Sequence, residues 1–108
     1  MRHYPTLDEV EEQYFRDHPE EVEPYLSEIF EEYASTGDSA ALLSSLRVIA
    51  RVRGVSQLAE KTGMTRQGLQ KALSEKGNPR LDSINSIMGA LGYRLTPQKR
   101  DMAEERVL

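Results

Sequence analysis

Apolar residues recur every three or four positions along most of this chain, which is the period of amphipathic helices. The clearest stretch, residues 55–73, predicts two short helices joined by a tight turn at residues 62–64. Ala59 is small enough for the helices to approach closely, Gly63 allows a positive φ in the turn, and Leu69 fixes the second helix to the first. Other apolar residues complete the inner face: Leu58, Met64 and Ala72.

Two helices are expected in the first 37 residues. The first follows Thr6, which forms a capping box with Glu9, and it stops near residues 17–19 because proline disfavours the α conformation in the residue before it. Its apolar residues fall on one stripe: Leu7, Val10, Tyr14 and Phe15. The second runs from about residue 20 to 33, with Pro24 near its first turn. Its apolar residues are Val22, Tyr25, Leu26, Ile29, Phe30 and Tyr33.

A linker at residues 35–38 leads into the remaining helices, with Gly37 closing one helix and Asp38 or Ser39 capping the next. The next helix runs from about 39 to 53, and Gly54 ends it. Its inward residues are expected to be Leu42, Leu43, Leu46, Ile49 and Ala50. The prediction is an all-α fold, a helix-turn-helix bundle with an acidic helical extension.

The last helix follows a loop at residues 74–79, and Gly92 terminates it. Its buried residues are expected to be Leu81, Ile84, Ile87, Met88 and Leu91. Residues 93–96 then alternate apolar and polar, which favours a short strand that pairs with its copy in a second subunit. The chain thus divides into a helical extension (1–37), a helix-turn-helix domain (38–97) and a flexible tail (98–108).

Composition excludes several classes of protein. A chain of 108 residues is one domain by length, and no apolar run approaches the roughly 18 residues of a membrane span. There is no cysteine, so neither a disulfide framework nor a cysteine zinc site is expected. The first ten residues lack the apolar region of a signal peptide, which predicts a cytoplasmic protein with no membrane partner.

Charge is segregated along the chain, so the formal net charge of −4 misleads. Residues 1–37 hold 11 acidic and two basic residues, a charge of −9, whereas residues 38–108 hold 12 basic and seven acidic residues, a charge of +5. The predicted helix pair therefore lies in the basic part of the chain, which favours contact with nucleic acid.

The outer face of the second helix in this pair carries hydrogen-bonding side chains and no acid. Arginine and glutamine suit guanine and adenine edges in the major groove. The face comprises Thr65, Arg66, Gln67, Gln70 and Lys71. Gly68 costs helix stability, which favours close approach by DNA or by another helix. The alternative is an ordinary helix pair with a solvated polar face.

Two further groups of residues leave alternatives open. The aromatic residues of the extension either pack on the domain or on a second copy, or form part of a docking surface for a basic protein. They are Tyr14, Phe15, Tyr25, Phe30 and Tyr33. Arg47, Arg51 and Arg53 lie on the polar side of their helix and serve either solubility or contact with flanking phosphates.

No enzyme chemistry is expected. His3 and His18 lie in the acidic extension, away from any nucleophile or glycine-rich loop. The neighbouring glutamates at 11–12 and 31–32 are better explained as solvated helix faces than as an acid/base pair. No residue spacing indicates a metal site, and no cofactor is expected.

The segment from about residue 38 to 96 resembles the lambda-repressor-like (XRE) helix-turn-helix domains, and more closely the addiction-module antidote proteins, the HigA-like antitoxins. The features that carry the resemblance are Ala59, Gly63 and Leu69, the GNP loop at 77–79 and the ALG ending at 90–92. Arg80 replaces the small polar cap that such domains often place after the proline.

This resemblance implies a homodimeric repressor that binds a palindromic operator in double-stranded DNA, often its own promoter, and neutralises a small basic toxin of the RelE/HigB type. Ser56 and Gln57 are then expected to meet one phosphate, and Lys76 and Asn78 the next. The alternatives are a regulator without a toxin partner and an interaction module that has lost DNA binding.

Overall fold

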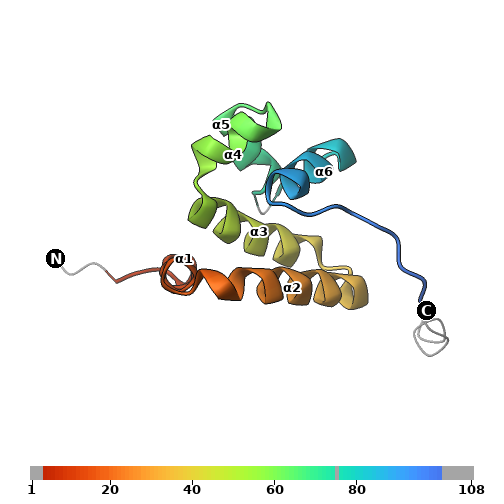
Figure 1. Cartoon of the computed structure of the whole chain (residues 1–108), viewed down its shortest axis with the longest axis horizontal. Helices are drawn as coiled ribbons and strands as arrows, with labels where there is room; N and C mark the ends of the chain where they lie inside the picture. The colour runs from red at the N-terminus through yellow and green to blue at the C-terminus, as the bar shows by residue number, and fades with distance from the viewer. Residues whose placement is uncertain (1–3, 75, 101–108) are drawn as a thin grey trace.

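Helix α3 (Ser39–Arg53) lies at the centre of the computed structural model, which describes residues 4–74 and 76–100 (Figure 1). Its Leu46 and Ile49 side chains are 1% and 0% exposed. Helices α1 and α2 lie along one side of α3 and the later helices lie on the other side. The other elements are α1 (Leu7–Asp17), the short 3-10 helix η1 (Pro19–Glu21), α2 (Val22–Thr36), α4 (Val55–Thr62), α5 (Arg66–Ala72) and α6 (Leu81–Ala90).

All regular structure in the described residues is helical, as expected for an all-α fold. Buried side chains from every α-helix form one hydrophobic cluster, so the first 37 residues share a core with the rest. The cluster comprises Phe15, Val22, Leu26, Ile29, Leu43, Leu46, Val48, Ile49, Ala50, Leu58, Ala59, Leu69, Leu73, Ile87, Met88 and Leu91. Among the helices at residues 4–74 and 76–100, none combines the length and apolar character needed to cross a bilayer.

Capping residues in the sequence predict several of the observed helix ends. The Thr6 hydroxyl accepts a hydrogen bond from the Glu9 N–H at 3.1 Å, which confirms the predicted cap of α1. Asp38 caps α3 by accepting from the Ala41 N–H at 3.1 Å. Gly37 ends α2 with a φ of +70°, a conformation that costs glycine little. Helix α2 extends to Thr36, so the linker is shorter than predicted.

Two expectations are not met in the single chain, one at the start of α6 and one after its end. Leu81 was expected inside but is 76% exposed, because it is the first residue of α6 and precedes the part of the helix that packs. Residues 93–100 contain no strand, which is consistent with a segment that has no partner strand in a single chain. Arg80 occupies the N-cap of α6 without a side-chain cap, as its residue type led us to expect. The predicted tail beyond residue 100 lies outside the described residues.

Candidate nucleic-acid interface

The α4–α5 pair is held by a tight turn on a buried inner face. Gly63 ends α4 with a φ of +75°, and the Met64 N–H donates to the Ala59 carbonyl oxygen at 3.1 Å. Ala59 is 4% exposed and Leu69 is 1% exposed, so both lie on the buried inner face of the pair. The two short helices and the turn predicted at residues 62–64 are therefore present.

The predicted interface residues all have exposed side chains. Two lie in the first turn of α4, five lie at or on α5, and two lie in the connection to α6. They are Ser56, Gln57, Thr65, Arg66, Gln67, Gln70, Lys71, Lys76 and Asn78. A period of 3.6 residues puts Gln67 and Lys71 opposite Leu69 and puts Arg66 and Gln70 on the flanks between. Since Leu69 is buried, this polar side faces outward.

Thr65 has a structural task at the start of α5. Its hydroxyl accepts a hydrogen bond from the Gly68 N–H at 2.9 Å and so caps the helix. A Cβ at position 68 would lie 3.0 Å from that hydroxyl oxygen, a tight contact. Thr6 caps α1 in the same way with Glu9 at the equivalent position, so the cap by itself does not require a glycine at position 68.

The start of α4 differs from the start of α5. Gly54 is its N-cap, with a φ of +98° and no side-chain cap. The Gln57 amide oxygen lies 2.8 Å from where a Cβ on Gly54 would be, so the amide folds over the helix start. The first N–H groups of a helix lack intrahelical partners, and an oxyanion is a suitable acceptor for them.

One hollow joins the two helix starts. The Arg66 guanidinium donates to the Ser56 hydroxyl at 2.8 Å, which links α5 to α4. The hollow beside this bond has a volume of about 530 Å³. It is lined by Glu12, Arg16, Arg51, Gly54, Val55, Ser56, Gln57, Arg66 and Gln70. The acidic α1 therefore borders the candidate interface, a neighbour that the sequence analysis did not anticipate.

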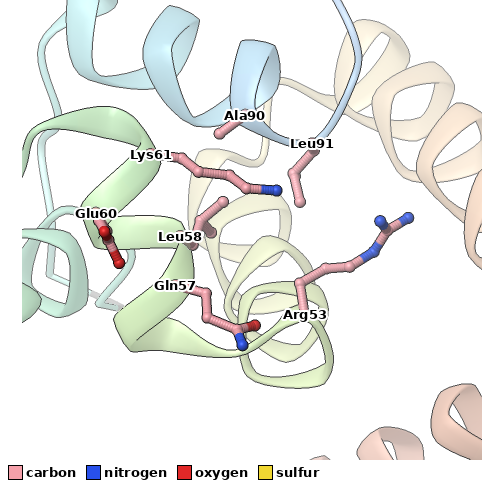
Figure 2. Close-up of a pocket in the computed structure, with 7 residues that line it drawn as sticks. All are labelled: Arg53, Gln57, Leu58, Glu60, Lys61, Ala90 and Leu91. Atoms are coloured by element: carbon pink, nitrogen blue, oxygen red, sulfur yellow. The ribbon is translucent and has the colours of Figure 1, made fainter.

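Gln57 also lines a second hollow, on the α6 side of α4, with a volume of about 580 Å³ (Figure 2). Leu58 and Leu91 are its buried apolar residues. Figure 2 shows the Lys61 side chain extending toward Leu91 and the Glu60 carboxylate turned away. Lys61 and Arg53 give this hollow a positive rim close to the start of α4.

The structure brings only some of the predicted residues together. Ser56, Gln57, Arg66 and Gln70 share one hollow, whereas Gln67 and Lys71 lie on α5 outside it. Lys76 and Asn78 lie in the connection between α5 and α6. Within the described residues, no group of three or more His, Cys, Asp or Glu side chains is arranged to hold a metal ion.

Two of the three α3 arginines have a role that sequence analysis missed. Arg51 lies 3.0 Å from Glu12 and 3.8 Å from Asp8, and Arg47 lies 3.7 Å from Asp8. These arginines tie α1 to α3, so neither solubility nor free contact with phosphates describes them. The sequence does contain a signal for this contact. The two carboxylates, Asp8 and Glu12, are four residues apart, as are the two arginines, so each pair lies on one face of its helix.

Arg47 also reaches the end of α5. Its guanidinium donates to the Leu73 carbonyl oxygen at 2.9 Å, and Leu73 is the C-cap of α5. A cation is favourable at a helix C-terminus because it meets the free carbonyl groups there. Arg47 thus links α1, through Asp8, to the end of α5.

A further contact joins α1 to α2. The Tyr25 hydroxyl donates to the Glu11 carboxylate at 3.5 Å. Burial raises the pKa of Tyr25 above its ordinary value, and the negative charge of Glu11 acts in the same direction. The hydroxyl therefore keeps the proton that it donates.

Comparison with known proteins identifies the family. The profile of a family described as "Probable addiction module antidote protein" matches residues 6–99, which include α1 and α2 as well as the α4–α5 pair. The chain therefore belongs to this addiction-module antidote family. An uncharacterized protein of Haemophilus influenzae is 39% identical over 84 residues, 78% of this chain and 82% of the relative. No solved structure is significantly similar.

Proposed function

We propose that this chain is a DNA-binding antitoxin that represses its own operon, with α4 and α5 as a lambda-repressor-like helix-turn-helix. One observation carries the DNA-binding half: α5 is anchored by buried Leu69 and presents arginine, glutamine and lysine outward without an acid. In this class of motif the second helix enters the major groove and its first residues contact base edges. Membership of the antidote family supports the antitoxin half.

The residues divide into base-contacting and phosphate-contacting sets. Arg66, Gln67 and Gln70 on the outer side of α5 contact base edges, and Lys71 contacts bases or the adjacent phosphates. Thr65 caps α5 and lies where the helix meets the groove. The uncapped start of α4, with Ser56 and Gln57, holds one phosphate. Lys76 and Asn78 hold the next phosphate from the loop.

One recognition helix spans only a few base pairs, so a homodimer is proposed. Two copies placed about 34 Å apart would read the half-sites of a palindromic operator. The toxin is proposed to be a small basic protein of the RelE/HigB type, encoded beside this gene. A transcriptional regulator without a toxin partner is the alternative.

The DNA-binding half is tested with Gln67→Ala on the DNA upstream of the gene. We expect a loss of roughly 1–3 kcal/mol on the operator and relaxed discrimination at one base pair. Fluorescence anisotropy with operators altered at single positions measures both. The control is Gln98→Ala, which removes an exposed amide in the segment after α6. Unchanged affinity and base preference for Gln67→Ala would contradict this placement of α5.

The antitoxin half is tested by growth of cells that express the adjacent small reading frame, with and without this chain. We expect the reading frame to arrest growth and this chain to restore it. An adjacent reading frame that is harmless, or toxicity that this chain does not relieve, would instead favour the regulator without a toxin partner.

A further inference from the structure

Helix α1 is oriented with its apolar side toward solvent. The large apolar side chains of its outer side, together with one residue just before the helix, are 47–75% exposed: Tyr4, Leu7, Val10 and Tyr14, here called the α1 stripe. An amphipathic helix ordinarily packs its apolar stripe on the core. The opposite arrangement leaves a row of apolar groups without cover in the single chain.

Contacts on the other side of the helix fix this orientation. Asp8 and Glu12 face the α3 arginines, with the shortest pair, Glu12 to Arg51, at 3.0 Å. Phe15 is 6% exposed and packs against Tyr25, with ring centroids 4.6 Å apart. Rotating α1 to bury the α1 stripe would break these ion pairs and withdraw Phe15, so the stripe stays exposed.

Tyr14 contacts two neighbouring rings although it is 47% exposed. Its ring meets the Phe15 ring edge to face, with centroids 5.4 Å apart, and lies 4.6 Å from the His18 ring. A side chain that is already held loses little conformational entropy when a partner covers it. Tyrosine is also among the residues that most often dominate binding energy. Tyr14 is therefore well placed to anchor an interface.

The border of the α1 stripe is acidic. A hollow of about 620 Å³ has Val10 and Tyr14 in its lining, together with three carboxylates. Its single cation, Arg16, lies 3.7 Å from Glu12 and donates to the Arg51 carbonyl oxygen. The remaining lining residues are Pro5, Glu9, Glu12, Gln13 and Asp17. An apolar centre with an acidic border complements a partner whose apolar group is surrounded by cations.

We propose that the α1 stripe is the surface that holds the basic toxin, a statement that rests on the antitoxin half of the proposed function. A second copy of this chain fits less well. A symmetric pair would place the same patch against itself, and with it two extensions of charge −9 each. Like charges brought together across an interface cost several kcal/mol by general estimates. A basic protein is attracted by that same charge.

The test replaces Leu7, Val10 and Tyr14 together by serine and measures binding to the purified product of the adjacent reading frame by calorimetry. We expect affinity to fall by about 100-fold, because anchors in the centre of an interface supply most of its binding energy. Leu81→Ser is the matched control. Leu81 is 76% exposed, lies on α6, and its replacement should leave affinity within about twofold. Thermal unfolding verifies that both variants remain folded.

The outcomes separate this inference from the proposed function. If the unaltered chain does not bind the toxin, the antitoxin function itself fails. If it binds and the triple variant binds equally well, the function stands and the α1 stripe is not the toxin surface. A third outcome also overturns the inference: sedimentation shows that the triple variant turns a dimer into a monomer while toxin affinity is unchanged. A second copy would then cover the stripe.

Discussion

Helices α1 and α5 are both short and amphipathic, yet they face the domain with opposite sides. Helix α5 packs its apolar side inward, with Leu69 at 1% exposure, and turns its polar side to solvent. Helix α1 packs carboxylates and one aromatic ring inward and leaves Leu7 at 74% exposure. A hydrophobic period therefore predicts that a helix has two faces, but the surface it meets decides which face is covered.

The surface that α1 meets explains the difference. Arg47 and Arg51 line the side of α3 that faces α1. Covering guanidinium groups with leucine and valine would remove their water without supplying hydrogen bonds, which is costly. Carboxylates supply those partners. Helix α5 meets the buried residues of α4 instead, so its leucine is the favourable contact.

The largest expected effect compares the same substitution on the two helices. Leu69→Ala should lower the free energy of unfolding by about 2–5 kcal/mol, because it leaves a cavity in the core. Leu7→Ala should change it by less than about 0.5 kcal/mol, because that side chain is mostly exposed. Urea unfolding followed by circular dichroism measures both. Similar losses for the two variants would show that α1 is not oriented as described.

The next largest effect concerns Arg47, which links α1 to the end of α5. Arg47→Met keeps an apolar stem but removes the bond to the Leu73 carbonyl and the ion pair with Asp8. We expect a loss of about 1–3 kcal/mol in the free energy of unfolding, since hydrogen bonds to charged groups are among the stronger ones. Arg53→Met is the control, because Arg53 lies on the same helix but lines the hollow beside α6. If both variants lost the same free energy of unfolding, the contacts of Arg47 with Asp8 and Leu73 would contribute nothing measurable to stability.

The same comparison shows what could be predicted from the sequence. The caps at Thr6 and Asp38 and the turn at Gly63 depend on residues three to five positions apart, so the sequence contains the whole signal. The bounds of α3 followed from such signals. The exposure of the candidate interface also followed, because the apolar positions of α5 define its inner side.

The orientation of α1 was beyond such reasoning. It depends on pairs such as Glu12 and Arg51, which are 39 positions apart in the chain. A stripe of apolar residues is ordinarily assigned to the core, and the four-residue spacing within each charge pair does not say that the two charged faces meet. The expected strand at residues 93–96 is absent from the single chain for a related reason, since a strand needs a partner that no local pattern supplies. DNA binding by the candidate interface remains a prediction.

The smallest expected effect concerns the border between α1 and the candidate interface. Glu12 lines the same hollow as Ser56 and Arg66, so operator phosphates held at α4 would lie near its carboxylate. Glu12→Gln removes that negative charge and the shorter of the two ion pairs of Arg51, leaving the pair with Asp8. A unit charge about 10 Å from a phosphate contributes roughly 0.4 kcal/mol in water, so operator affinity should rise about two- to fourfold for a dimer.

Salt dependence distinguishes this cause from a change in fold. The gain should be largest at low salt and should fade near 0.5 M because the screening length there falls to about 4 Å. Glu31→Gln is the control, since it makes the same charge change near the far end of α2, away from α4 and α5 (Figure 1). Anisotropy titrations across a salt series measure the difference. If Glu12→Gln bound the operator no better than Glu31→Gln, α1 would be electrostatically separate from the DNA-binding surface, and the two regions would act independently.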